Sequence, residues 1–288
     1  MDKKVSIVIP TYNRKRTIIK VIDSYLGQAH LYELIFIVDG STDGTYEYLR
    51  EQAMFHPVIK IKRHGKTQGV SVSRNDGLDT ASGNYILFGE DDVHLGDSYI
   101  GTLLNCLEKT NADIAGGRIF YSRRDETVEQ TINRCQDGGG PLMNYWLMSA
   151  NYSRRTSEPQ PMPFLHAISL GKADVCKKIR FDPAFFAREE TDFYLRAGEK
   201  GHKIMFCPDA VCVHLQRDRE GGGGWRVGVW KYQALAAQNN NLLVEKHYPI
   251  LKEWGMKGNK ITFKLLHLLN RIRILYIYYK FSLKRHRS

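Results

Sequence analysis

Three consecutive acidic residues, Glu90, Asp91 and Asp92, form the first group in the sequence whose types suggest chemistry. They come directly after the apolar run 85–88, which is typical of a buried strand. Carboxylates in this position can hold a hard divalent cation, Mg²⁺ or Mn²⁺, against a diphosphate, and the cation then assists a departing nucleotide diphosphate. The alternative is an acidic loop that caps the following helix near Asp97.

Two further polar segments are expected at the same edge of the fold. Asp39 and Gly40 follow the apolar run 34–38, where Gly40 allows a sharp turn and Asp39 can accept hydrogen bonds from a base or a ribose. The same segment also fits a β-turn that caps the next helix. Arg74 lies on a predicted helix over 70–81, where it either contacts a diphosphate through two N–H groups or is solvated.

A second acidic cluster opens a predicted helix over 190–200. Glu190 in this cluster can act as a general base toward a sugar hydroxyl, provided that it faces the loop of Glu90. Acidic residues also favour helix N-termini through the helix dipole, so capping is the alternative. His214, at the end of the last predicted strand, either completes the ligand set of a metal or is structural.

These residues need a framework, and the alternation of short apolar runs with helically spaced segments predicts an α/β fold. Such βαβ units build a mostly parallel central sheet flanked by helices, and ligands bind at the carboxyl ends of its strands. The second half of the chain is less regular. The predicted strands span 5–9, 34–38, 58–61, 85–88, 114–121, 164–170, 203–207 and 210–214, and the predicted helices span 17–26, 45–52, 70–81, 173–178, 190–200 and 225–247.

Composition limits the class of protein. The 288 residues are 42% hydrophobic and 25% charged, which excludes disordered and fibrous chains. The five cysteines are odd in number and include no CxxC pair, so we expect neither a disulfide framework nor a zinc ribbon. This cysteine usage predicts a cytoplasmic location. The N-terminus turns polar after Pro10, too early for a signal peptide.

The positive charge gathers at the C-terminus. The formal net charge is +11, yet no acidic residue follows Glu253, whereas nine lysines and arginines do. Leu265, Leu268 and Ile272 share one arc of a predicted tail helix with basic borders, which suits the surface of an anionic membrane rather than nucleic acid. The alternative is a terminal helix packed on the body. The predicted parts are 1–220, a sheet domain; 221–257, a glycine hinge and helical extension; and 258–288, the tail helix.

Taken together, the motifs resemble those of a family 2 glycosyltransferase with the GT-A fold. The segments VSIVIPTYNR, VDGSTDGT, GVSVSRNDGL, ASGNYILFGEDDV and REETDFYLRAGEKGHKIMFCPDAVCVHL occur in the family's order, over about residues 4–215. The resemblance implies inverting transfer of a sugar from a nucleotide-diphosphate sugar to an acceptor hydroxyl. It also implies Mg²⁺ or Mn²⁺ as the cofactor and a glycan or lipid-linked acceptor, in cell-surface polysaccharide or glycan assembly.

The resemblance also implies a role for each residue. Asp92 of the DxD-like triplet is expected to bind the metal with Glu90 and His214, and Glu190 to be the catalytic base. Two departures are that Glu90 replaces the usual first aspartate and that Glu190 stands where aspartate is frequent. The expected contacts to the nucleotide sugar are Pro10, Thr11, Tyr12, Asp39, Arg74 and Asp91.

Three other functions are compatible with parts of this pattern. A sugar nucleotidyltransferase would also use a metal and a nucleotide, but it usually carries a Gly-rich basic loop after the first strand. A non-catalytic module that binds a sugar nucleotide would not need both acidic clusters. Nucleic-acid binding would rest on the tail alone. Sugar transfer therefore remains the expectation, with the enzyme peripheral at the inner face of the cell membrane.

Overall fold

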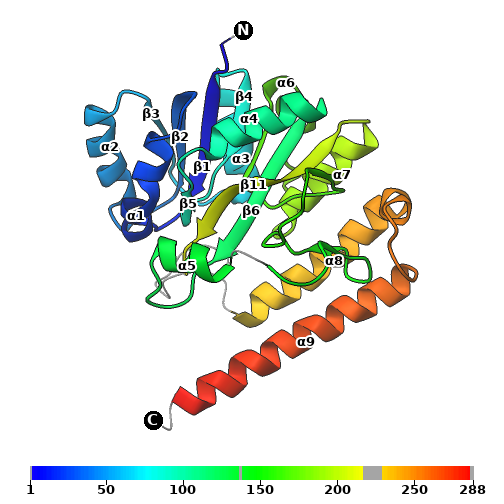
Figure 1. Cartoon of the computed structure of the whole chain (residues 1–288). Helices are drawn as coiled ribbons and strands as arrows, with labels where there is room; N and C mark the ends of the chain where they lie inside the picture. Colours follow the sequence, from blue (N-terminus) through cyan, green and yellow to red (C-terminus); the bar gives the residue numbers. More distant parts are fainter. Residues whose placement is uncertain (1, 136–137, 217–228, 286–288) are drawn as a thin grey trace.

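The computed structural model describes residues 2–135, 138–216 and 229–285, and it shows a central sheet with helices on both faces (Figure 1). The strand order is β3-β2-β1-β4-β10-β6-β11-β5, and β9 pairs with β11. The strands are β1 Val5–Thr11, β2 Leu31–Asp39, β3 Ile59–His64, β4 Tyr85–Phe88, β5 Val93–Leu95, β6 Ile114–Tyr121, β9 Gln160–Pro161, β10 Ser169–Lys172 and β11 Ile204–His214, with β7 Met143–Asn144 and β8 Ser149–Ala150 in a separate hairpin.

The first part of the sheet is parallel, as the βαβ pattern predicts. β1 lies between β2 and β4 and runs parallel to both, and β3 runs parallel to β2. The apolar runs that form these strands are buried because helices cover both faces of the sheet. The carboxyl ends of β1, β2 and β4 therefore meet at one edge, and each is followed there by one of the polar segments.

The second part of the sheet is mixed. β10 runs antiparallel to both β4 and β6, and β11 runs parallel to β6. The prediction of a strand over 164–170 is largely wrong, since only its last two residues belong to β10. Phe164 and Leu165 are apolar because they are buried in a loop, not because they pair in a sheet. The two strands predicted over 203–207 and 210–214 are a single strand, β11, whose pairing with β6 is interrupted between Phe206 and Val211.

Helices form two layers around the sheet. Side chains of α1, α2 and α4 belong to the core on one face, and those of α3, α6, α7 and α8 belong to the core on the other. The expected apolar spacing of the first helix is confirmed, because Ile18, Val21, Ile22 and Tyr25 are all buried. The helices are α1 Lys15–Leu26, α2 Thr45–Phe55, α3 Val70–Thr80, α4 Tyr99–Thr110, α5 Val128–Cys135, α6 Ala173–Ile179, α7 Glu189–Glu199, α8 Val229–Glu253 and α9 Lys260–Arg285.

The C-terminal helices α8 and α9 lie side by side below the sheet (Figure 1). α8 extends six residues beyond its predicted end, past a kink at His247, where the following Pro249 disturbs helical geometry. The four-glycine hinge, the boundary at residue 220 and the start of the helix predicted from 225 lie outside the described residues. α9 packs Phe263, His267 and Leu275 inward, as the alternative of a body-packed tail predicts.

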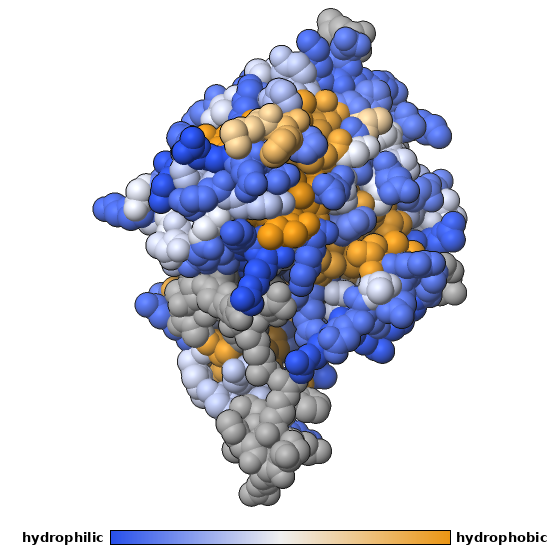
Figure 2. Space-filling model, turned by 90° about the vertical axis from the view of Figure 1, so that its left-hand side faces the viewer, coloured by the Kyte–Doolittle hydropathy of each residue, from blue (hydrophilic) through white to orange (hydrophobic). Residues whose placement is uncertain are grey.

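The outer side of α9 keeps its apolar arc in solvent. Leu265, Leu269 and Ile272 are each more than half exposed. On the face of the molecule drawn in Figure 2, hydrophilic residues predominate and hydrophobic patches lie between them. Across the described ranges, none of the helices combines the length and hydrophobicity that crossing a bilayer requires.

Candidate active site

A cavity of about 580 Å³ opens at the carboxyl edge of the parallel strands. Its walls come from the ends of β1 and β2, from the start of α3, from the loop after β4, and from residues 183–190 before and within α7. All the residues predicted to contact nucleotide, metal or acceptor line this cavity, except His214. The lining residues from that prediction are Pro10, Thr11, Tyr12, Asp39, Arg74, Glu90, Asp91, Asp92 and Glu190.

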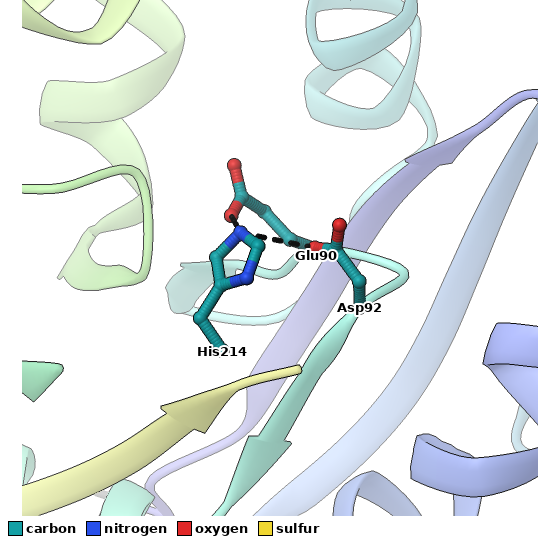
Figure 3. Close-up of side chains that lie close together, drawn as sticks. All are labelled: Glu90, Asp92 and His214. Atoms are coloured by element: carbon teal, nitrogen blue, oxygen red, sulfur yellow. Dashed lines mark ion pairs between the residues drawn. The ribbon is translucent and has the colours of Figure 1, made fainter. Parts of the chain in front are cut away.

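Glu90, Asp92 and His214 converge, as Figure 3 shows, although His214 is more than 120 positions away in the chain. One ligand atom from each residue lies within 4.8 Å of the others. His214 Nε2 is 3.4 Å from Asp92 Oδ1 and 3.8 Å from Glu90 Oε2. The other ring nitrogen, Nδ1, lies 2.9 Å from the carbonyl oxygen of Leu215, and a hydrogen bond donated there leaves the lone pair of Nε2 directed at the carboxylates.

The backbone fixes this arrangement. β5 pairs with β11 so that His214 lies opposite Val93, and the amide of Leu215 donates to the carbonyl of Asp92 at 2.8 Å. On the other side of the loop, the Tyr25 hydroxyl is 2.8 Å from the carbonyl oxygen of Glu90. The acidic loop is therefore tied to both α1 and the last strand of the sheet.

The residues present fit a divalent cation. Two carboxylates and one imidazole are ligands that Mn²⁺ accepts, and Mg²⁺ binds mainly through the carboxylates. Burial and the neighbouring charge of Asp92 raise the pKa of Asp91 to about 7, which shows how crowded the negative charge is in this loop. A cation would relieve that crowding.

Two buried arginines lie close to the carboxylates of the acidic loop. Arg14, directly after β1, is buried and lies 3.7 Å from both Asp91 and Asp92. Arg74, 2% exposed, lies 2.7 Å from Glu189 and 3.5 Å from Glu90. Arg74 thus links the acidic loop to the start of α7. The prediction placed Arg74 at a diphosphate, and the structure places it on the cavity wall between these carboxylates.

Asp39 is held by its own loop. Its carboxylate accepts backbone N–H bonds from Gln68 at 2.7 Å and Gly69 at 3.0 Å, and it is 2.8 Å from His64 Nδ1. His64 Nε2 is in turn 2.6 Å from Asp76, and the two carboxylates outweigh the effect of burial and raise the pKa of the imidazole. Asp39 therefore orders the loop before α3 as well as lining the cavity.

Glu190 lies in the first turn of α7 and lines the same cavity as the acidic loop. The residue before this helix, Arg188, has a positive φ of 62°, a conformation that non-glycine residues rarely adopt. Burial, together with the negative charge of Glu189, raises the pKa of Glu190 to about 8, although Arg74 opposes the shift. A carboxyl group with a pKa near neutrality is suited to accept and return protons.

Several residues on the cavity wall were missed by sequence reasoning. Arg14 was visible, since it follows β1 within a segment already singled out. His166 was not visible, because the segment 164–170 was predicted to be a strand, whereas His166 lies in a loop. Burial lowers the pKa of His166 to about 4, so the ring is neutral at physiological pH. Tyr232, from α8, could not be connected with the site before the chain was folded.

Comparison with known proteins identifies the family of the chain. The family model of Glycosyl transferase family 2 matches residues 6–179, more than half of the chain. Glycosyltransferase GlyA of Streptococcus pneumoniae is 32% identical over 128 residues, which cover 44% of this chain and 18% of GlyA. The poly(ribitol-phosphate) beta-glucosyltransferase of Bacillus spizizenii is 32% identical over 120 residues, covering 40% of this chain and 19% of that enzyme. The chain thus matches only about a fifth of the length of either relative.

Solved structures share the fold at low sequence identity. A mannosyltransferase from Pyrobaculum calidifontis, in complex with GDP-Man and Mn²⁺, superposes with a TM-score of 0.59 at 18% identity, covering 93% of this chain and 69% of that chain. GalNAc-T7 with UDP, GalNAc and Mn²⁺ gives a TM-score of 0.61 at 18% identity, covering 76% of this chain and 44% of that chain. The fold is that of the GT-A glycosyltransferases, and by its sequence the chain belongs to glycosyl transferase family 2.

Proposed function

We propose that the protein is an inverting, metal-dependent glycosyltransferase that moves a sugar from a nucleotide-diphosphate sugar to an acceptor hydroxyl. The observation that carries this proposal is that Glu190 lines the same cavity as Glu90 and Asp92, which converge with His214. A general base and a candidate cation site in one cavity can act on the same reacting bond.

In this mechanism Glu190 removes the proton from the acceptor hydroxyl while that oxygen attacks the anomeric carbon. The attack comes from the face opposite the nucleotide diphosphate, so the new glycosidic bond forms as the bond to the diphosphate breaks. The transition state resembles an oxocarbenium ion, as in glycoside hydrolysis. A divalent cation held by Glu90, Asp92 and His214 would supply positive charge to the departing diphosphate.

The donor end is proposed to lie between β1 and α3. Asp39 and the segment from Pro10 to Tyr12 line that part of the cavity. The solved relatives support a nucleotide sugar there, since one holds GDP-Man with Mn²⁺ and the TarS structure from Staphylococcus aureus holds UDP-GlcNAc. A glycan acceptor is supported by relatives named as poly(ribitol-phosphate) glycosyltransferases.

Product analysis tests the proposal. Incubation with a panel of nucleotide sugars, Mn²⁺ and candidate acceptors should release a nucleoside diphosphate. Release of pyrophosphate would instead identify a sugar nucleotidyltransferase, and binding without turnover a non-catalytic module. Donor binding should also raise the melting temperature in a thermal-shift screen.

Two substitutions separate the roles at the site. Glu190→Gln should lower the rate of transfer about 10²- to 10⁴-fold and still bind the donor, whereas Asp92→Ala should weaken donor binding in the presence of Mn²⁺. Glu47→Gln is a matched control, because Glu47 also lies in the first turn of a helix but is exposed on α2, away from the cavity. Retained turnover in Glu190→Gln would refute the base assignment.

We also propose that α9 binds the inner face of an anionic membrane. The exposed side chains of Leu265, Leu269 and Ile272 suit insertion among lipid headgroups, and the lack of acidic residues after Glu253 suits an anionic surface. Together they support a cytoplasmic, peripheral location and an acceptor close to the membrane.

Flotation with vesicles tests the membrane proposal. The double variant Leu269→Gln, Ile272→Gln should lose most binding to vesicles that contain phosphatidylglycerol. The matched control is Met54→Gln, Phe55→Gln, because these α2 side chains are 75% and 70% exposed on another element. Equal binding by both double variants would refute the role of α9.

A further inference from the structure

Buried polar atoms without hydrogen-bond partners collect where the start of α7 meets α8 and α9. Asn240 of α8 is fully buried, and its amide Nδ2 has no hydrogen-bond partner. His267 of α9 is 4% exposed, and its Nδ1 has none either, while its Nε2 lies 2.9 Å from the carbonyl oxygen of Leu147. The Nε of Arg271, one turn further along α9, is also buried and unpaired. Buried polar atoms are rarely left in this state in a folded protein.

The same place holds two guanidinium groups whose hydrogen-bond acceptors within the described ranges are neutral. Arg188 donates to the side-chain oxygen of Asn240 and the carbonyl of Met148, both at 3.1 Å, and to the hydroxyl of Thr191 at 3.2 Å. Arg271 donates to the amide oxygen of Gln233 at 3.1 Å. Within the described ranges, no carboxylate forms an ion pair with either guanidinium. Charges that are largely removed from water are normally paired.

Electrostatics indicate that these groups act on one another. Burial, together with the positive charges of Arg188 and Arg271, lowers the pKa of His267 to about 3. Burial likewise lowers the pKa of Arg271. We call Arg188, Asn240, His267 and Arg271 the basic cluster. Glu190 acts on Arg188, but its own pKa of about 8 leaves it mostly protonated at neutral pH, so an anion would stabilise the two guanidinium groups.

The basic cluster borders the catalytic cavity. Arg188 lines that cavity and stands two residues before Glu190, and Tyr232 of α8 lines it as well. Asn239, next to Asn240, accepts the backbone N–H groups of Phe186 and Ala187 and so fixes the wall between α8 and the cavity. The basic cluster therefore lies next to the proposed base. The acidic loop and Arg14, where the donor diphosphate is proposed to bind, line the same cavity from other segments of the chain.

We propose that the basic cluster binds a phosphate group of the acceptor, which holds the attacking hydroxyl near Glu190. A phosphate fits better than a carboxylate because its tetrahedral oxygens can accept hydrogen bonds from several directions, here from the amide of Asn240 and from two guanidinium groups. The inference rests on the proposed function, because it assigns the acceptor side of that cavity.

Calorimetry with the full chain tests this site. Glycerophosphoglycerol is the soluble phosphodiester probe, and it is titrated with and without saturating UDP and Mn²⁺, which occupy the donor side. We expect the diester to bind under both conditions and acetate not to bind. Absence of Arg271-dependent binding both to this diester and to phosphatidylglycerol vesicles, or acetate binding of equal strength, would overturn the proposal.

Substitution locates the binding. Arg271→Gln should weaken diester binding at least about tenfold, as expected for loss of a charge-assisted hydrogen bond. Arg273→Gln removes the same charge from an exposed position on the same helix and should keep the wild-type affinity. The imidazole nitrogen signals of His267 should shift on addition of the diester in wild type, which gives a second measurement if a variant folds poorly. Equal affinity of both variants, or unchanged His267 signals, would contradict the site.

The same experiments distinguish the possible sources of the phosphate. They also distinguish failure of this inference from failure of the proposed function. Binding of the soluble diester indicates a phosphate within a polymer acceptor, whereas Arg271-dependent binding only to phosphatidylglycerol vesicles indicates a lipid phosphate. Nucleotide binding and transfer are measured on the same samples. If the diester binds but no donor supports transfer, the proposed function fails and the anion site stands.

Discussion

The pH dependence of sugar transfer offers a quantitative test of Glu190 as the base. Burial and the charge of Glu189 raise the pKa of Glu190 to about 8, so only about a tenth of the molecules carry the carboxylate at about pH 7. Since the carboxylate is the form that accepts a proton, transfer should rise about tenfold from about pH 6 to about pH 7 and level off above about pH 8.

A neighbouring substitution should move this profile in a defined direction. Glu189 raises the pKa of Glu190 and also pairs with Arg74 at 2.7 Å. Glu189→Gln removes a negative charge and leaves Arg74 free to stabilise the Glu190 carboxylate. Both effects lower the pKa of Glu190. The acid limb of the profile, which is the pH range in which the rate rises, should therefore move to lower pH whatever the absolute rate becomes.

The assay is release of nucleoside diphosphate at saturating Mg²⁺, with each profile scaled to its own plateau. Nucleotide binding is measured at every pH, which separates titration of the base from titration at the acidic loop. Glu190→Gln should lose about 10²- to 10⁴-fold in rate and should lack the acid limb. An acid limb that persists in Glu190→Gln, or that stays in place in Glu189→Gln, would refute the reasoning.

Two further predictions concern stability. Although burial opposes it, hydrogen bonds to cationic partners hold the pKa of Asp192 at about 2, below its ordinary 3.8. This contribution is present above about pH 4 and is lost as pH falls toward about 2, so Asp192→Asn should cost about 2 kcal/mol at neutral pH and little in acid, as measured by urea unfolding. Lys246 pairs with both Asp192 and Asp182, and the side chain of Asp182 is one-third exposed, so Asp182→Asn should cost less. Gly77→Ala should destabilise the protein by about 1–3 kcal/mol, because the added Cβ would lie 2.1 Å from Val8. Gly101→Ala should not, because there is open space around Gly101. Equal unfolding midpoints of the two variants would contradict the packing argument.

The first half of the fold was predictable because each strand there is an apolar run buried on both faces. Once strands such as 5–9 and 85–88 are recognised as parallel, their carboxyl ends must share an edge, and the polar residues after them must gather. That reasoning also brought Glu190 to the same cavity, although it depended on the resemblance as well as on spacing.

The rest required the folded chain. The apolar segment 164–168 is buried as a loop, and hydrophobicity alone does not separate such a loop from a strand. The contact of His64 with Asp39 and Asp76 depends on the register of β3 against β2. The unpaired donors of α8 and α9 could not be recognised either, because a missing partner becomes visible only when every neighbour has been placed.

One link between helices bears on how much of the chain the chemistry needs. His247, buried at the kink of α8, lies 2.9 Å from Asp192 and 2.7 Å from Glu199, so α8 is fastened to the helix that carries Glu190. Lys246 also reaches Asp192, at 2.7 Å. A fragment ending near residue 220 would remove two hydrogen-bond partners of this carboxylate and loosen the helix that carries the base. The shortest active fragment should therefore retain α8 to beyond its proline.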